Sequence, residues 1–143
     1  MNVTLKNEFP NSEKEPFKKT SDISQIYNCI AWAAGDDSKW YEPDPYGMYY
    51  WPPEIPRVYS INAYISVFEK IGYIKCDNSD IEIGYEKVAV FSIKRVPTHA
   101  ARQLSNGLWT SKLGQNIDVS HTIKAIEEGQ YGNVIQFLKR KKT

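Results

Sequence analysis

The stretch THAARQLSNGLWTSKL, residues 98–113, carries the clearest long-range signal in the chain. The Asn-Gly dipeptide at 106–107 separates two runs that can form strands, and it is the strongest short signal for a β-hairpin. A two-residue turn would place Thr110 on the face of His99 and Ser111 on the opposite face. A change of one residue in the turn would reverse this arrangement.

The segments on both sides of this hairpin predict further strands and helices. Residues 86–94 alternate well enough for a strand, and residues 60–72 form the clearest helix, with an apolar stripe at helical spacing. A second helix is predicted over 119–128, with Asp118 as its N-cap. Periodicity leaves 133–139 open between a final strand and a short helix. The order of elements predicts an α+β fold with a small antiparallel sheet.

The composition sets broad limits on the protein. A length of 143 residues with 41% hydrophobic and 24% charged residues suits one domain with a sizeable core. The formal charge of +1 argues against a nucleic-acid binder. The chain lacks an apolar run of membrane length and an apolar signal region, so we expect a cytoplasmic protein without membrane contact. Residues 1–20 are expected to be a flexible N-terminal extension and 21–143 a single domain.

Residues 21–35, SDISQIYNCIAWAAG, show helical spacing of apolar side chains. Two starts fit this segment. Ser21 or Asp22 would cap a long helix, whereas Asn28 would cap a short one and place Cys29 in its first turn.

Residues 36–59 contain five prolines and many aromatic residues, so they form neither a regular helix nor a central strand. Loops of this length are usually functional or disordered, and this one is too aromatic for disorder. Two interpretations remain open. The aromatic side chains either pack over the core as a lid or form one wall of a substrate groove.

Few residues in the chain can carry reactive chemistry. The two cysteines are Cys29 and Cys76, and the two histidines are His99 and His121. Their spacing does not match a structural zinc site, and phosphate-binding and dinucleotide-binding motifs are absent, so no metal or cofactor is expected. Cys76 is expected to be a bystander and His121 to be exposed. The protein therefore either catalyses a reaction through a Cys–His pair or has no catalytic chemistry.

Several motifs resemble a family of short bacterial proteins known as a domain of unknown function, over roughly residues 25–140. They are YNCIAWAAGD at 27–36, THAARQL at 98–104, WTSKLG at 109–114, Asp118, and YG at 131–132. The Asn-Cys pair that opens a helix, followed by a His-led hairpin, also resembles in layout the papain-like superfamily, with its NlpC-like and transglutaminase-like branches. This second resemblance implies a Cys-bearing helix packed on the sheet, with Cys29 as nucleophile and His99 as general base.

The papain-like pattern needs two further polar groups. Asp118, Asn116 and Ser111, in that order, are candidates to orient the imidazole, although Asp118 serves equally well as a helix cap. Gln25, or instead Asn28 or the amide of Cys29, is the candidate donor to the oxyanion. The candidate substrate-binding residues are Asn28, Trp40, Tyr41, Trp51, Trp109 and Ser111.

Two functions from different classes follow. The first is a thiol hydrolase or acyl-transferase that acts on a peptide, amide or glycan-linked substrate. The second is a non-catalytic peptide- or sugar-binding module, in which Cys29 and His99 are packing residues, and an effector or immunity component is a variant of it. Arg102 and Lys112 either bind an anionic group or lie on a solvated hairpin face.

Overall fold

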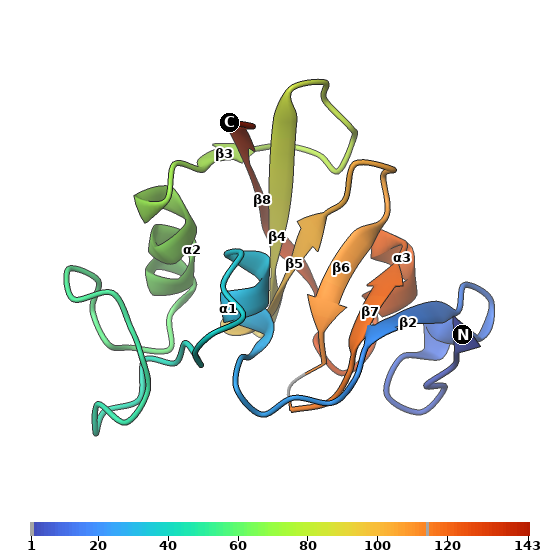
Figure 1. Cartoon of the computed structure of the whole chain (residues 1–143), viewed down its shortest axis with the longest axis horizontal. Coiled ribbons are helices and arrows are strands. Elements are labelled where there is room, and N and C mark those ends of the chain that lie inside the picture. The colour runs from blue at the N-terminus through green and yellow to red at the C-terminus, as the bar shows by residue number, and fades with distance from the viewer. Residues whose placement is uncertain (1, 114) are drawn as a thin grey trace.

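A computed structural model describes residues 2–113 and 115–143, so that Gly114 at the end of the WTSKLG motif lies outside the described part. One antiparallel sheet of eight strands dominates the fold, in the order β1-β2-β7-β6-β5-β4-β8-β3 (Figure 1). The strands are β1 Asn2–Val3, β2 Phe17–Ser21, β3 Ile74–Cys76, β4 Tyr85–Ile93, β5 Val96–Gln103, β6 Trp109–Lys112, β7 Asp118–His121 and β8 Asn133–Lys141. The helices are η1 Pro10–Glu13, a 3₁₀ turn, and α1 Cys29–Ala33, α2 Ile61–Lys70 and α3 Ile123–Ile126.

The predicted α+β, papain-like layout is therefore wrong, because the described residues form a large sheet with three short α-helices. α2 is the one long helix in the described residues, as predicted, and Ser60 caps it by accepting a hydrogen bond from the Ala63 amide. The predicted helix over 119–128 is mostly absent. Asp118 lies in β7 instead of capping a helix, and Thr122 caps the short α3. Val119 and Ile126 are buried at a spacing that imitates a helix, although they belong to two different elements.

The hairpin between β5 and β6 forms where the Asn-Gly dipeptide predicts it, but with another register. The Leu104 amide donates to the Leu108 carbonyl, so the turn holds the three residues 105–107. Gly107 provides the positive φ of 91° that this turn needs. Arg102 consequently pairs with Thr110, one residue away from the two-residue register. The side chains of β6 therefore face the opposite way from the expectation.

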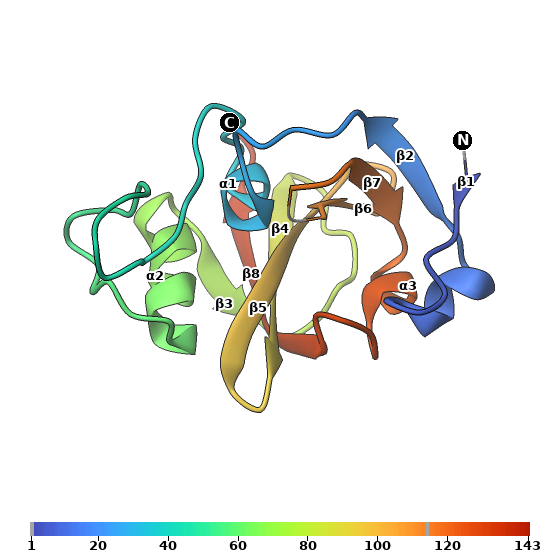
Figure 2. The same cartoon turned by 90° about the horizontal axis from the view of Figure 1, so that it is seen from below.

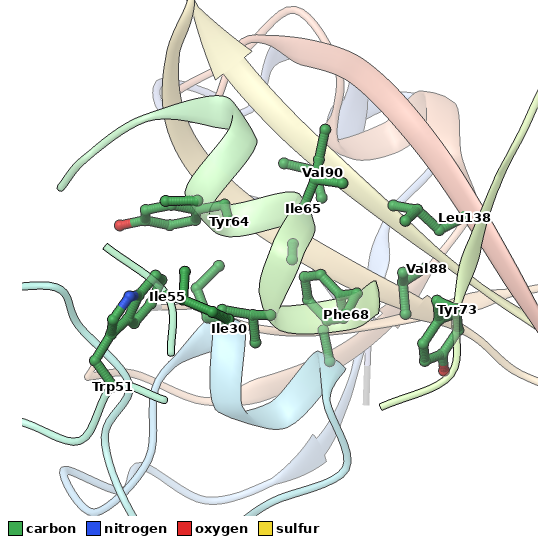
Figure 3. Close-up of a cluster of buried hydrophobic side chains, with 14 residues drawn as sticks. Ile30, Trp51, Ile55, Tyr64, Ile65, Phe68, Tyr73, Val88, Val90 and Leu138 are labelled. Atoms are coloured by element: carbon green, nitrogen blue, oxygen red, sulfur yellow. The ribbon is translucent and has the colours of Figure 1, made fainter. Parts of the chain in front are cut away.

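The sheet buries a core on each face. α1, α2 and the aromatic loop cover the first face, where Figure 3 shows Phe68 of α2 near Val88 of β4. Figures 1 and 2 place α3 and the N-terminal segment together, away from α1 and α2. The second core includes Phe9, Phe17, Phe91, Trp109 and Ile126.

The N-terminal segment departs from the expected flexible extension. Phe9 and Phe17 are buried in the second core, and β2 pairs with β7 over Lys18, Lys19 and Ser21. The polar composition of residues 1–20 conceals this, because Phe9 and Phe17 are the only fully buried apolar residues within residues 2–20. Within residues 2–113 and 115–143, no helix has the length and apolar character needed to cross a bilayer.

Candidate functional site

Cys29 is the first residue of α1, and Asn28 is the N-cap. This confirms the short-helix alternative. The Asn28 side-chain oxygen accepts hydrogen bonds from the amides of Ala31 (3.2 Å) and Tyr41 (3.1 Å). Its side-chain nitrogen donates to the Tyr41 carbonyl at 2.6 Å. One amide side chain thus starts the helix and fastens the aromatic loop beside it.

The environment of the Cys29 thiol does not favour the thiolate. The side chain is half-buried and packs against the first core. Burial raises the pKa of Cys29 to about 11, even though nearby backbone hydrogen bonds and the charge of Lys112 lower it. The sulfur is therefore a protonated thiol at neutral pH, the opposite of an activated nucleophile.

His99 faces away from Cys29. Ala100 belongs to the core cluster against which Cys29 packs, and successive side chains of a strand point to opposite faces. The His99 ring stacks on Tyr131, with ring centroids 4.0 Å apart, and meets the ring of Phe91. Both partners belong to the second core. The sheet therefore separates the two members of the expected Cys–His pair.

Ser111, rather than Cys29, is the hydrogen-bond partner of His99, and the same hydroxyl group also contacts His121. Nε2 of His99 lies 2.9 Å from the Ser111 hydroxyl oxygen, and Nε2 of His121 lies 2.7 Å from the same oxygen. Burial lowers the pKa of His99 well below its usual value and that of His121 to about 4. His121, expected at the surface, is thus buried, because β7 replaces the predicted helix. Ser111 ranks only third among the candidates from the sequence, because the assumed two-residue turn places it on the face opposite His99, whereas the observed register places it on the same face.

The other residues assigned to the imidazole and the oxyanion lie elsewhere. The buried Asp118 accepts hydrogen bonds from the hydroxyl groups of Tyr27 (2.5 Å) and Ser21. Asn116 and Gln25 are exposed. Of the three candidates for orienting His99, only Ser111 contacts it, and Asp118 instead ties β7 to the segment before α1.

Lys112 shares the α1 face of the sheet and is buried. Its ammonium group donates to the carbonyl oxygens of Ser24 (2.8 Å) and Asn116 (2.6 Å) and lies 5.3 Å from the centre of the Tyr27 ring. Burial lowers the pKa of Lys112, and the carboxylate of Asp118 opposes this shift. Lys112 therefore links the segment before α1, at Ser24, to the loop between β6 and β7, at Asn116.

The aromatic candidates separate into buried and accessible residues. Trp51 is buried in the first core and donates to the Pro56 carbonyl, and Trp109 is buried in the second core. Trp40 and Tyr41 keep partial exposure, and they pack against Tyr49 and Tyr50 respectively. One part of the loop, around Trp51, therefore packs over the core as a lid, and another part, around Trp40 and Tyr41, remains partly accessible to solvent.

Asp44 and Arg57 hold this loop in one shape. The Asp44 carboxylate accepts from the amides of Met48 (2.8 Å) and Tyr49 (3.1 Å). The Arg57 guanidinium donates to Asp44 Oδ1 at 3.0 Å and to the Tyr49 carbonyl at 2.7 Å. Hydrogen bonding to these groups lowers the pKa of Asp44, although burial opposes the shift. Prediction from the sequence missed both residues, although the run PDPYGM signals a tight turn.

Comparison with known proteins gives one match. Residues 18–139 match the model of a family described as a domain of unknown function (DUF7689), and the chain belongs to this family. The resemblance to a domain family of unknown function is confirmed, whereas the comparisons give no support to the papain-like superfamily. No curated protein and no solved structure matches the chain. In the described residues, no three His, Cys, Asp or Glu side chains gather to hold a metal ion.

Proposed function

We propose that this member of the DUF7689 family is a non-catalytic recognition module whose aromatic loop binds an apolar, positively charged peptide segment of a partner protein. One observation carries the proposal: the loop exposes several large apolar side chains while its backbone is fastened. We call these side chains the aromatic platform. It comprises Tyr46, Met48, Tyr49, Tyr50, Val58 and Tyr59.

The exposure of the platform is unusual for a loop that is held so tightly. Tyr46 is 86% exposed and Met48 is 75% exposed, although the Asp44–Arg57 pair and the Asn28 side chain anchor the surrounding chain. Figure 1 shows the loop projecting beside α2, away from the sheet. Tyrosine and methionine are enriched at protein interfaces, and large exposed apolar patches mark binding sites. A fastened loop also loses little conformational entropy on binding.

The charge of the loop favours a basic partner. Residues 36–59 contain five acidic and two basic side chains, in a chain whose formal charge is +1. Complementary charge accelerates encounter and orients the partner. The carboxylates contribute mainly through this long-range field, because Asp36, Glu42 and Asp44 already accept hydrogen bonds within the loop.

These internal hydrogen bonds also favour a peptide over a glycan. The hydroxyl group of Tyr59 donates to Glu42 at 2.6 Å, and that of Tyr41 donates to Asp36 at 2.8 Å. A sugar requires free polar groups to satisfy its hydroxyls. The platform instead presents the aliphatic side chains of Met48 and Val58, which suit apolar peptide side chains. We place the protein in the cytoplasm, where its two free cysteines stay reduced.

Selection from a phage-displayed random peptide library tests the proposal. We expect the selected peptides to be rich in Lys, Arg and apolar residues. A synthetic peptide from this set should bind the Tyr46→Ser/Met48→Ser double variant at least tenfold more weakly. The matched control is Ile83→Ser, because Ile83 is 98% exposed but lies between β3 and β4, outside the aromatic loop.

Three outcomes contradict the proposal. The first is selection of peptides without a basic or apolar character. The second is equal binding by the platform variant and the Ile83→Ser control. The third is saturable binding on a glycan array that depends on Tyr46, which would make the module a carbohydrate binder.

A further inference from the structure

We propose that a hollow between the N-terminal segment (residues 5–10) and the loop after α3 (residues 127–132) binds a primary alkylammonium group, with Glu8 and Tyr131 as polar contacts. Figures 1 and 2 place this part of the chain away from the aromatic loop and α2. The site therefore does not depend on the function proposed for the aromatic platform. Either a free amine or a lysine side chain of another protein supplies the group.

Two adjoining hollows lie where these segments meet. The inner hollow has a volume of about 180 Å³, and its apolar lining is Leu5, Phe9 and Leu113. Its polar lining includes Glu8, Gln130 and Tyr131. The outer hollow, of about 390 Å³, shares Glu8 and Gln130 with the inner one and adds Glu128. Pockets for whole small molecules start at roughly 300 Å³, so the inner hollow suits a group the size of one long side chain.

The walls of the inner hollow are joined directly to each other. The Gln130 amide donates to the Glu8 carbonyl at 2.7 Å, which ties the N-terminal segment to the loop after α3. A Cβ atom at Gly129 would lie 2.5 Å from the same carbonyl oxygen, so the two segments approach more closely than a side chain at this position would allow. The hollow is thus part of the packed fold.

The Tyr131 hydroxyl is an unused polar group at the inner hollow. Tyr131 is 9% exposed, and within residues 2–113 and 115–143 its hydroxyl has no hydrogen-bond partner. Unlike the hydroxyl of Tyr73, it is not enclosed by protein atoms. Stacking on His99 and the hydrogen bond from the Thr98 hydroxyl to the Tyr131 carbonyl fix the residue. Burial raises the pKa of Tyr131, so the group remains a neutral hydroxyl that accepts hydrogen bonds.

The uncompensated charges at the two hollows are negative. In the described residues, the carboxylates of Glu8 and Glu128 form no ion pair and no hydrogen bond. Among the same residues, no lysine or arginine lines either hollow. The neighbouring Lys6 instead lies 4.0 Å from the carboxylate of Glu13. The hollows therefore attract a cation.

A primary ammonium on an aliphatic stem matches this combination of groups. Its three N–H donors match the Glu8 carboxylate, the Tyr131 hydroxyl and the side-chain carbonyl of Gln130, which are all acceptors. The stem would lie along the apolar side chains of Leu5 and Leu113. An anion would be repelled by the two carboxylates, and an uncharged alcohol would leave them without a counter-charge.

Titration followed by ¹H–¹⁵N NMR tests the site on the full chain. n-Butylamine hydrochloride is the cationic probe at neutral pH and constant ionic strength, whereas n-butanol and sodium butyrate carry a similar stem with no charge or a negative charge. We expect saturable shifts of the amide signals of residues 128–131 with butylamine alone. A parallel titration with Nα-acetyl-lysine methylamide distinguishes the two sources. Tighter binding than that of butylamine assigns a lysine side chain, and weaker binding assigns a free amine.

Two variants and one control make the test specific. Glu8→Gln keeps the size of an exposed side chain but removes its charge, so it should weaken butylamine binding by about tenfold. Tyr131→Phe keeps the ring that stacks on His99 and should weaken binding several-fold. The matched control is Glu13→Gln, which should bind like the wild type, because Glu13 is exposed in the same segment but lines neither hollow.

Three results overturn the proposal. They are shifts without saturation in the wild-type protein, equal shifts with butylamine and butanol, and unchanged binding in Glu8→Gln. If Tyr131→Phe fails to fold, the wild-type titration and the exposed Glu8→Gln variant still decide it.

Discussion

The hydroxyl oxygen of Ser111 lies 2.7 Å from Nε2 of His121, and this hydrogen bond joins the two buried side chains. Nδ1 of His121 lies 2.7 Å from the Thr122 carbonyl, so that nitrogen carries the proton and Nε2 is an acceptor. Ser111 therefore donates to His121. Its oxygen in turn accepts from Nε2 of His99 at 2.9 Å. This chain requires a neutral His121, and the buried Nδ1 of His99, which has no partner in the described residues, keeps that imidazole neutral as well.

Acid should destabilise the protein through these histidines. Their folded-state pKa values lie below the ordinary value of 6.5, so their contribution to stability is complete above that pH and is lost as the pH falls, for His121 towards about 4. Between pH 7.5 and pH 5, the free energy of unfolding in urea should fall by about 2 kcal/mol through His121 alone, and the depressed pKa of His99 should add to this loss. His121→Gln should flatten this dependence. A flat profile in the wild-type protein would contradict the assignment.

Removal of the shared hydroxyl should be costly. Ser111→Ala leaves Nε2 of both histidines without a partner in a buried site, and each lost partner costs roughly 1–3 kcal/mol. Urea unfolding measures the loss. The matched control is Ser105→Ala in the exposed hairpin turn, which should stay within about 0.5 kcal/mol of the wild type. Equal values for the two variants would show that the contacts of Ser111 contribute little.

The thiol of Cys29 should react slowly. With a pKa of about 11, its alkylation rate in a Cys76→Ser background should still rise steeply above pH 9. His99→Ala should leave this profile unchanged, because His99 faces the second core. The measurement is the iodoacetamide rate constant as a function of pH. A plateau near neutral pH would restore an activated nucleophile and weaken the case for a binding module.

Loss of Asp44 should loosen the aromatic loop without unfolding the sheet. Asp44→Ala removes the acceptor of the Met48 and Tyr49 amides and the partner of Arg57. Amide hydrogen exchange should accelerate in residues 44–59 alone, and binding to the selected peptide should weaken. The exposed Asp37 supplies the control variant Asp37→Ala. Unchanged exchange in Asp44→Ala would mean that the loop is held by other contacts.

Local signals in the sequence predicted local structure well. Asn28 and Ser60 cap helices as their residue types indicate, and the Asn-Gly dipeptide at 106–107 marks a real turn. The register of the β5–β6 hairpin could not be predicted, because the same dipeptide fits a turn of two residues and a turn of three. The face of every β6 side chain, and hence the partner of His99, depends on that single residue.

Burial of the N-terminal segment and of β7 was not predictable for a related reason. Phe9 and Phe17 stand alone in a polar stretch, and only their contact with the second core explains their positions. β7 is buried along its whole length, so its four residues show no alternation of apolar and polar types. The resemblance to papain-like enzymes failed for the same lack of long-range information, because a Cys-bearing helix and a His-bearing strand do not specify which face of the sheet each occupies.

The double use of Asn28 restricts which residue can occupy that position. Serine, threonine and aspartate cap helices well, but an ionised aspartate has no donor for the Tyr41 carbonyl, and the hydroxyl groups of serine and threonine reach less far than the Asn28 amide. An aspartate would place its charge against that carbonyl, and a serine would be too short to span the gap. Any exchange at this position would therefore release the loop from the helix even where the helix itself survives.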